Sequence, residues 1–587
     1  MLILIASMGV RLKGFHSEDI RNLVPSEITL PMSVEELENT ENNRIQNRTI
    51  KSVRLGSIGI SYQTGITANG TRIAPDELRL LVAPGMVFAY DTILFVTVLR
   101  YVHLMQREEI QAKILRDHYF KISTGSISEF SLMGLAYLER CHFAKAKKLA
   151  ELYERGCFIL HLDGTNEGGI YTHFVVREGI RGNVLYAEKI VSESEKAIIP
   201  ILKKVKQHFG VPDAMISDMS APIGKAVQAM FPNIPHRLCH FHFLKAIGTS
   251  LLSEKHKPLM ISVKRMKNIL NAQRKGLVAK LNSSRNKKYH EDCTWLISII
   301  DQINDYQNDL SGEGFPFDLP ALAFHNSCEQ VSCVIETILN EVLESEKELC
   351  IILCFIKNRI QEFLDCSQIN QLKNLNDIFM KLRDILHPKT EKEQTPLSWG
   401  MINSDTQLVD IEEKLEKLYE RSVKKAKNKQ SKYLLTAWGI VQNRLKKYKG
   451  KLNPVIEFND ENFILPRTNN LCETGFRDCK RKGRRITGLR HLSNYMDNLP
   501  PQYFYTFNLD DLDYIKTVFG NGEICDSFHF TDKNSVKADV EKMKIQRLSP
   551  KSIDYKLIRG KDYFKRFTEH FTSQEKGGNS LRSKEVA

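Results

Sequence analysis

The chain has 587 residues and a formal net charge of +14 at pH 7, which allows about three or four structural units with large cores. The basic surplus favours a polyanionic partner, although a diffuse surplus of this size also occurs in proteins that bind none. No stretch reaches the ~20 uncharged apolar residues of a membrane span, and the 12 scattered cysteines, none before Cys141, support neither a disulfide framework nor an N-terminal zinc ribbon. We therefore expect a soluble intracellular protein that contacts no membrane.

The first 155 residues divide into an N-terminal region and a helical region. Residues 1–85 are predicted to be partly extended or disordered, because 17–50 are polar and acidic and the apolar runs that follow are short. Residues 86–155 carry a helical pattern of three helices that resembles a helix-turn-helix, although an ordinary three-helix bundle fits equally well. In the first interpretation, the third helix offers Ser126 and Ser128 to a DNA groove. The apolar contacts expected in that interpretation join Ile110, Ile114 and Leu115 to Ile127 and Phe130.

The stretch GCFILHLDGTNEGG, residues 156–169, organises the next region. Its apolar run, 158–162, has the length of a strand and is followed by glycines, which is typical of a strand buried on both faces. His161 and Asp163 lie on one side of it, because side chains alternate along a strand. A carboxylate at the end of a buried strand needs a positive partner. The alternative is a solvated aspartate that opens a turn.

Residues 172–242 continue this region, which we bound at 156–245. The runs 172–176 and 184–191 follow short turns and predict an antiparallel meander with the first strand. A helix over 192–210 is expected next, then a strand that ends at Asp218, a short helix and a further strand, HRLCHFH, over 236–242. If the two strand ends are neighbours, Asp163 and Asp218 require a cation between them.

Residues 246–460 are predicted to form a mostly helical insertion. Basic residues gather at 255–288 and again at 422–451. A charge run is usually a solvated face, but several together are able to line a path for a duplex through phosphate contacts. All three tryptophans lie in this insertion, and for each of them core packing is a better interpretation than stacking on a base: Trp295, Trp399 and Trp438.

The segment 465–488, LPRTNNLCETGFRDCKRKGRRITG, predicts a helix that begins at about Leu471 after three good capping residues. Its apolar face is formed by Cys472, Phe476 and Cys479. Glu473 shares an adjacent stripe with three basic residues, namely Arg477, Lys480 and Arg484. The alternative is a capping box, in which Glu473 only satisfies backbone donors of the first turn.

Four motifs thus occur in order along the chain: LDGT with Asp163, SDMS with Asp218, CHFH with Cys239 and His242, and TNNLCE with Glu473. This ordered set resembles the DDE transposases of the ribonuclease H-like superfamily, of the prokaryotic insertion-sequence type and related to the mutator-like and hAT-like groups. The resemblance covers roughly residues 155–245 and 460–490.

The resemblance implies an α/β fold, in which a ribonuclease H-like mixed sheet is flanked by helices and interrupted by a large all-α insertion. The helix-turn-helix-like region precedes this core. Residues 461–500 then supply the second half of the core with the helix of the catalytic glutamate, and residues 501–587 form a C-terminal tail.

The resemblance also implies the chemistry. Asp163, Asp218 and Glu473 are expected to be catalytic and to hold two Mg²⁺ ions, for which Mn²⁺ substitutes, with Asp163 between the ions. Cys239 and His242 are expected to support the active site, the alternatives being half of a zinc site or a buried thiol beside a core histidine. The basic residues that hold phosphates of the cleaved strand are Arg477, Lys480 and Arg484.

The expected function is metal-dependent cleavage at transposon ends and transfer of the exposed 3′-hydroxyl into target DNA. Its partners are double-stranded DNA, at the terminal repeats and at the target, and at least one further copy of the chain. The expected location is the cytoplasm of a prokaryote, in association with the nucleoid. Two alternatives stay open: a catalytically silent DNA-binding regulator on a transposase scaffold, and a metal-dependent nuclease without strand transfer.

Overall fold

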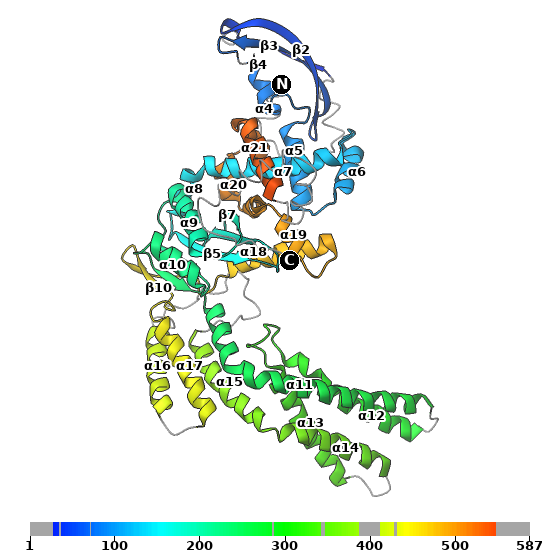
Figure 1. The fold of residues 1–587 in the computed structure, drawn as a ribbon. Helices are drawn as coiled ribbons and strands as arrows, with labels where there is room; N and C mark the ends of the chain where they lie inside the picture. The colour runs from blue at the N-terminus through cyan, green and yellow to red at the C-terminus, as the bar shows by residue number, and fades with distance from the viewer. Residues whose placement is uncertain are drawn as a thin grey trace, which may run out of the picture. The chain divides into compact units, whose positions relative to one another are not determined.

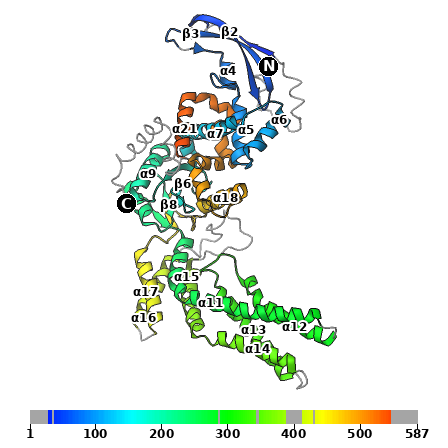
Figure 2. The ribbon, with the colours of Figure 1, turned by 45° about the vertical axis from the view of Figure 1, so that its right-hand side comes forward.

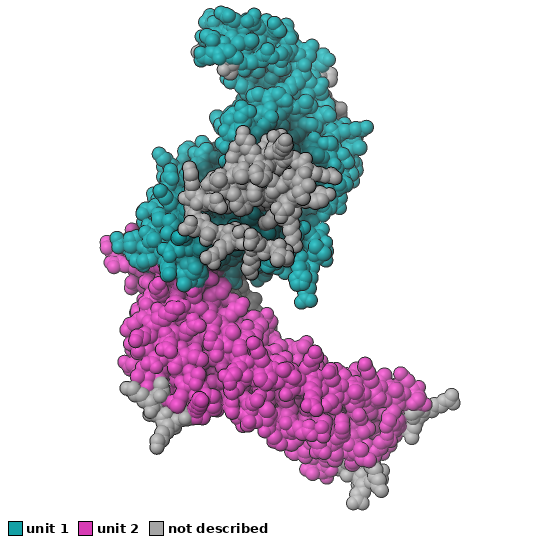
Figure 3. Space-filling model, in the orientation of Figure 1, with its two compact units in different colours: residues 1–215, 220–235, 470–587 teal, residues 216–219, 236–469 magenta. Residues whose placement is uncertain are grey.

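A computed structural model of the chain describes residues 27–33, 37–70, 72–283, 287–341, 347–386, 411–427 and 431–546. The chain divides into two compact units, which Figure 3 shows in teal and magenta. The first unit contains residues 1–215, 220–235 and 470–587, and the second contains residues 216–219 and 236–469. Trp399 and the end of the predicted tail, after residue 546, lie outside the described residues.

A five-stranded sheet carries the α/β part of the chain (Figure 1). The order of its strands is β7-β6-β5-β8-β9, and their bounds are Ile159–Thr165 (β5), Thr172–Glu178 (β6), Val184–Ile190 (β7), Ala214–Ser217 (β8) and His236–Leu238 (β9). β6 pairs antiparallel with both β5 and β7, which confirms the predicted meander. The backbone N–H of Asp213 donates to the carbonyl of Phe158 at 2.8 Å, so β8 and β5 begin side by side.

Three helices of the first unit accompany the sheet: α8 (Ala146–Tyr153), α9 (Glu195–Phe209) and α10 (Ala221–Met230). The predicted helix over 192–210 is confirmed in α9, whose N-cap Ser194 accepts a hydrogen bond from the N–H of Ala197. Gly210 follows the helix at a φ of +84°, a conformation that favours glycine. The buried face of α9 repeats at helical spacing: Ile198, Ile201, Leu202, Val205 and Phe209.

The structure corrects the strand predicted over residues 236–242. β9 ends at Leu238, and the 44-residue helix α11 (His240–Ser283) begins two residues later. The apolar residues that follow are buried at helical spacing, and their packing overrides the strand-like composition of the short run before them. Cys239 therefore precedes a helix, and His242 lies in the first turn of that helix.

The N-terminal part of the first unit is a small sheet covered by one helix. Its strands are β1 (Glu27–Leu30), β2 (Thr40–Ser52), β3 (Gly56–Thr67) and β4 (Arg72–Ile73), and its helix is α4 (Asp76–Leu81). Figure 2 shows β2 and β3 as a long antiparallel pair. Residues 1–85 were expected to be partly extended or disordered, and residues 40–52 are extended, as strand β2. A small apolar cluster holds α4 on the sheet through Ile50, Ile58, Ile60 and Leu78.

The three helices predicted after residue 86 are confirmed as α5 (Tyr90–Tyr101), α6 (Arg107–His118) and α7 (Thr124–Ala144). Ile110 and Ile114 are fully buried in one core with Ile127 and Phe130, as expected. Leu115 is 45% exposed, so its predicted contact is wrong. It lies next to Ile114 on α6, and the helix turns its side chain away from the buried face.

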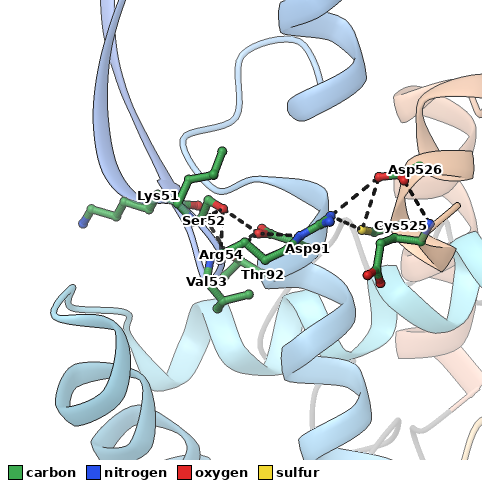
Figure 4. Close-up of polar contacts among 10 residues, drawn as sticks. Lys51, Ser52, Val53, Arg54, Asp91, Thr92, Cys525 and Asp526 are labelled. Carbon is green, nitrogen blue, oxygen red and sulfur yellow. Dashed lines mark hydrogen bonds and ion pairs between the residues drawn. The ribbon is translucent and has the colours of Figure 1, made fainter. Parts of the chain in front are cut away.

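Figure 4 shows how the N-terminal sheet is joined to the helices of the first unit. Asp91, at the start of α5, is 8% exposed and accepts hydrogen bonds from the hydroxyl of Ser52 and the backbone N–H of Arg54. The Arg54 guanidinium lies 3.6 Å from the Asp91 carboxylate and 3.6 Å from that of Asp526. The turn between β2 and β3 is thus held by a buried carboxylate whose donors come from the turn itself.

We expect the substitution Asp91→Asn to loosen the N-terminal sheet, because the amide accepts these donors less well and leaves part of them unsatisfied. The expected cost is about 1–3 kcal/mol in the opening free energy of β2 and β3, measured by hydrogen exchange of their amides. Asp76→Asn, which alters only an exposed pair with Arg79, is the control and should change little. Equal protection of β2 and β3 in both variants would contradict the role of Asp91.

The chain after residue 470 returns to the first unit and completes its core. Its elements are α18 (Asn470–Thr487), α19 (Ser493–Asn498), η4 (Pro501–Asp510), α20 (Leu512–Phe519), η5 (Ile524–Phe530) and α21 (Lys533–Gln546). The aromatic rings of these elements are buried in the same cluster as the sheet and α7: Tyr503, Phe504, Tyr505, Tyr514 and Phe528. Residues 501–546, which we expected as part of a tail, are therefore an integral part of the core.

The second unit is almost entirely helical, as predicted for the insertion. Its elements are α11, α12 (Lys287–Asn304), η1 (Asp305–Asp309), α13 (Pro320–Glu341), α14 (Lys347–Leu364), α15 (Ser367–Leu386), α16 (Ile411–Lys427), α17 (Lys432–Lys447), β10 (Val455–Phe458) and β11 (Glu461–Ile464). Trp438 is 7% exposed in its core, and Trp295 packs against the same core. Core packing is thus confirmed for both tryptophans. Among the described helices, none is long and apolar enough to cross a membrane.

Candidate active site

Asp163 is a buried residue of a middle strand. β5 continues two residues beyond it, to Thr165, so Asp163 lies within the strand instead of opening a turn. Its side chain shares a face with His161, and these residues stand opposite Val175 and Arg177 of β6. Asp163 is 8% exposed, and its Oδ1 accepts a hydrogen bond of 2.9 Å from the N–H of Gly164. The strand therefore holds a carboxylate in a largely desolvated place.

Glu473 lies in the first turn of α18, and α18 packs on β5 and β6. The apolar face predicted for this helix is confirmed, because Cys472, Phe476 and Cys479 are buried. The helix comes so close to β6 that a Cβ at Gly475 would lie 2.3 Å from Nη2 of Arg177. The acids at positions 163 and 473, distant in sequence, are thus carried by two elements in direct contact.

Arg177 lies beneath α18 and escaped the sequence analysis. Its guanidinium is buried, donates to the carbonyl of Gly182 at 3.1 Å and stacks over the ring of Phe507. Burial lowers the pKa of Arg177, while Cys472 and Asp478 act in the opposite direction. Among the described residues, its Nε and Nη2 have no hydrogen-bond partner. A buried positive charge with so few partners is costly, so it persists only in a tightly packed place.

The Cys239 and His242 motif lies next to the segment that leads into Glu473, within the second unit. The N–H of His240 donates to the carbonyl of Arg467 at 2.8 Å, and the N–H of Asn469 donates to Sγ of Cys239 at 3.3 Å. Asn469 is fully buried, and Thr468 is nearly so. The motif thus fixes the chain just before α18 begins.

His236 supports the backbone at Asp218 and was also missed from the sequence. Ser217 donates its hydroxyl to the carbonyl of Asp218 at 2.8 Å, so Nε2 of His236, 2.8 Å from that hydroxyl, is the donor to it. Burial, with Lys451 and Arg237 nearby, lowers the pKa of His236 to about 4. A neutral histidine therefore orients the residue that precedes Asp218.

Two of the three basic residues predicted to hold phosphates are engaged by a carboxylate. Nζ of Lys480 lies 2.8 Å from Glu167, and Nη2 of Arg484 lies 3.8 Å from the same group. Glu167 belongs to the loop after β5, where Asp497 accepts hydrogen bonds from the N–H groups of residues 170 and 171. Arg477 is exposed, and no ion pair of it is recorded among the described residues.

Ser126 and Ser128 lie in the first turns of α7, whose remaining length is largely buried. The N–H of Ser126 donates to the N-cap hydroxyl of Ser123 at 3.0 Å, and Nη1 of Arg107 donates to the hydroxyl of Ser128 at 3.4 Å. Both side chains are half-buried. Their contact with DNA stays a prediction, and only the start of α7 is available for it.

Comparison with known proteins does not assign the chain to a family. No family model matches the chain, and no curated protein matches it. Thirteen chains of solved structures match, among them one described as "Drosophila P element transposase strand transfer complex". That chain is 11% identical, the match covers 75% of this chain and 96% of that one, and the TM-score is 0.33. A likeness of that size assigns neither a family nor a function.

The buried histidines of the site predict a loss of stability in acid. Burial lowers the pKa of His173, which donates to the carbonyl of Met496, from 6.5 to about 4. The histidine is therefore protonated below about pH 6.5 in the unfolded chain, but only below about pH 4 in the folded chain. Stability should fall across this window, by about 3 kcal/mol for such a histidine.

His173→Gln keeps a donor for Met496 and does not titrate, so the urea midpoint should depend less steeply on pH between 6.5 and 4. The exposed His103→Gln is the control and should keep the slope of the parent chain. An unchanged slope in His173→Gln would show that this ring does not contribute.

The pair between Glu167 and Lys480 predicts a gain in DNA binding when it is removed. Glu167→Gln should raise affinity for a short duplex about two- to five-fold, which corresponds to the ~0.5–1 kcal/mol of such a pair, measured by fluorescence anisotropy. Glu151→Gln removes the same charge from an exposed position on α8 and is the control. Equal gains in both variants would mean that only net charge matters.

Proposed function

We propose that the chain is a DNA transposase of the ribonuclease H-like DDE type, which cuts the ends of a mobile element and joins them to target DNA. One observation carries the proposal: α18 returns after the whole helical insertion and packs on the strand of Asp163, with Glu473 in its first turn. Joining two ends calls for at least two copies of the chain.

The strand order supports the place of the second acid. Asp163 and Asp218 lie the same number of residues beyond the hydrogen-bonded pair Phe158 and Asp213. Asp163 lies within β5, and Asp218 directly follows β8, the neighbouring strand of the sheet. Corresponding residues of neighbouring strands project to the same face. This equal spacing favours the interpretation that the two carboxylates act together.

The donor set fits the metal that this chemistry needs. All three side chains offer carboxylate oxygens, which Mg²⁺ prefers and Mn²⁺ accepts, and Asp163 is largely buried. Asp163, Asp218 and Glu473 would hold the ions. When bound, the ions supply an activated water and neutralise charge on the phosphate.

The rest of the proposed reaction is done by side chains of this chain. Arg477, Lys480 and Arg484 project from the helix of Glu473 and would hold phosphates of the strand that is cut. Lys480 and Arg484 must exchange Glu167 for the phosphate, since both contact it. Cys239 would support the site through the segment before α18, where the N–H of Asn469 donates to its Sγ.

A DNA-binding regulator without catalysis is the second candidate. It is favoured by Arg177, because a buried cation beside the helix of Glu473 opposes the binding of a metal ion there. Metal binding therefore separates the two candidates directly.

The acids are tested by Asp163→Asn and Glu473→Gln. We expect each variant to bind a labelled duplex that bears the element's terminal sequence as the parent does, and to lower nicking and strand transfer by at least ~100-fold, the usual weight of an electrostatic catalytic group. Binding of Mn²⁺, measured by electron paramagnetic resonance, should weaken in both variants. Asp478→Asn, on the same helix, is the matched control.

A parent chain that binds the duplex and no Mn²⁺ would contradict the proposal in favour of the regulator. Nicking without strand transfer would favour a nuclease. Cleavage at the parent rate by Asp163→Asn would show that Asp163 is not a catalytic residue.

A further inference from the structure

The long helix α11 of the second unit carries an acid-free stretch. From Lys255 to Ser283 the sequence has no Asp or Glu. Its basic residues are Lys255, Lys257, Lys264, Arg265, Lys267, Arg274, Lys275 and Lys280. An ordinary solvated helix face mixes charges of both signs, often as pairs three or four residues apart. The basic residues of this stretch therefore repel one another, because the stretch itself contains no acidic residue that offsets their charge.

Part of this charge is used inside the second unit. Arg274 lies 2.7 Å from Asp301, Lys280 pairs with Glu348, and Lys267 stacks over the ring of Tyr306. Lys255 lies 2.8 Å from Glu254, the residue just before the stretch. The first three contacts join α11 to α12, η1 and α14. The four basic residues named here therefore already have partners within the second unit.

The remaining basic residues form a line on the outward face. Lys257, Lys264 and Lys275 are exposed, and no ion pair of theirs is recorded in the part of the chain that the structure describes. The intervals of seven and eleven residues equal about two and about three helical turns, so the three lysines lie above one another. Arg265 flanks this line. The opposite face is buried through Leu259, Val263, Met266, Leu270 and Leu277.

We propose that this line, the α11 rail (Lys257, Lys264 and Lys275), binds the phosphate backbone of double-stranded DNA without regard to sequence. The proposal rests on the proposed function, of which the duplex is the substrate. The rail spans about 27 Å at 1.5 Å per residue, which corresponds to roughly eight base-pair steps at ~3.4 Å.

The chemistry of the rail fits a duplex backbone. Apart from Arg265, which flanks the line, the exposed residues between the lysines are uncharged, including Ile261, Asn268 and Ala272. These residues do not form a set of side chains that hydrogen-bonds to base edges. Lysine is a flexible point charge that suits contacts with phosphate. Because α11 is packed along its opposite face, its backbone already holds the lysines in line, and the entropy cost of binding a duplex falls on the lysine side chains.

The test is the salt dependence of binding to a random-sequence duplex without divalent metal, measured by fluorescence anisotropy on the full chain. The variant is the triple substitution Lys257→Gln, Lys264→Gln and Lys275→Gln, in which glutamine keeps the helix propensity. We expect the slope of log K against log salt to become shallower by about 2.7, and the affinity at ~0.1 M salt to fall on the order of 100-fold.

The matched control is Lys147→Gln, Lys148→Gln and Lys203→Gln, which removes the same charge from exposed helix positions of the first unit. It should keep the slope of the parent chain. A triple variant that binds with the parent slope, or a control that loses as much, would overturn the rail. Asp163→Asn should retain the full slope, so the loss of cleavage and the loss of the rail are separate results.

Discussion

The contact between α18 and the sheet is the constraint on which the candidate site depends. Gly475 lets the helix approach β6 so closely that no side chain fits between its backbone and the Arg177 guanidinium. The cation below is buried with few partners, which is costly unless the surrounding packing is tight. A side chain at 475 would meet the end of the Arg177 side chain, so the guanidinium would have to shift for α18 to keep its place. The contact of α18 with the sheet therefore depends on how this buried arginine is packed.

The elements with strong local patterns were predictable from the sequence. The meander of β5, β6 and β7, the helix α9 and the apolar face of α18 follow from alternation or helical spacing that local burial reinforces. The helical insertion was recognisable for the same reason. The strand over 236–242 was wrong because its few residues carry a strand-like composition, whereas the packing of α11 that decides their conformation lies further along the chain.

The contacts that support the site were not predictable, because each joins segments far apart in sequence. The sequence does not distinguish Arg177 from other arginines, because its burial depends on the contact between β6 and α18. The role of His236 likewise depends on its contact with Ser217. Glu167 was an unremarkable acid near Asp163, and the structure makes it the partner of Lys480. The sequence signal for Arg177 was a charged residue directly after the apolar run 174–176, at the position opposite His161. Such a signal marks a buried charge without naming its partner.

The hydrogen bond between His240 and Arg467 joins the two ends of the helical insertion. A loop whose ends are pinned together transmits little of its own length or composition to the chain on either side. The helices between these residues share a buried core of their own. The insertion therefore folds around its own interior, and the chain leaves it close to the point where it entered.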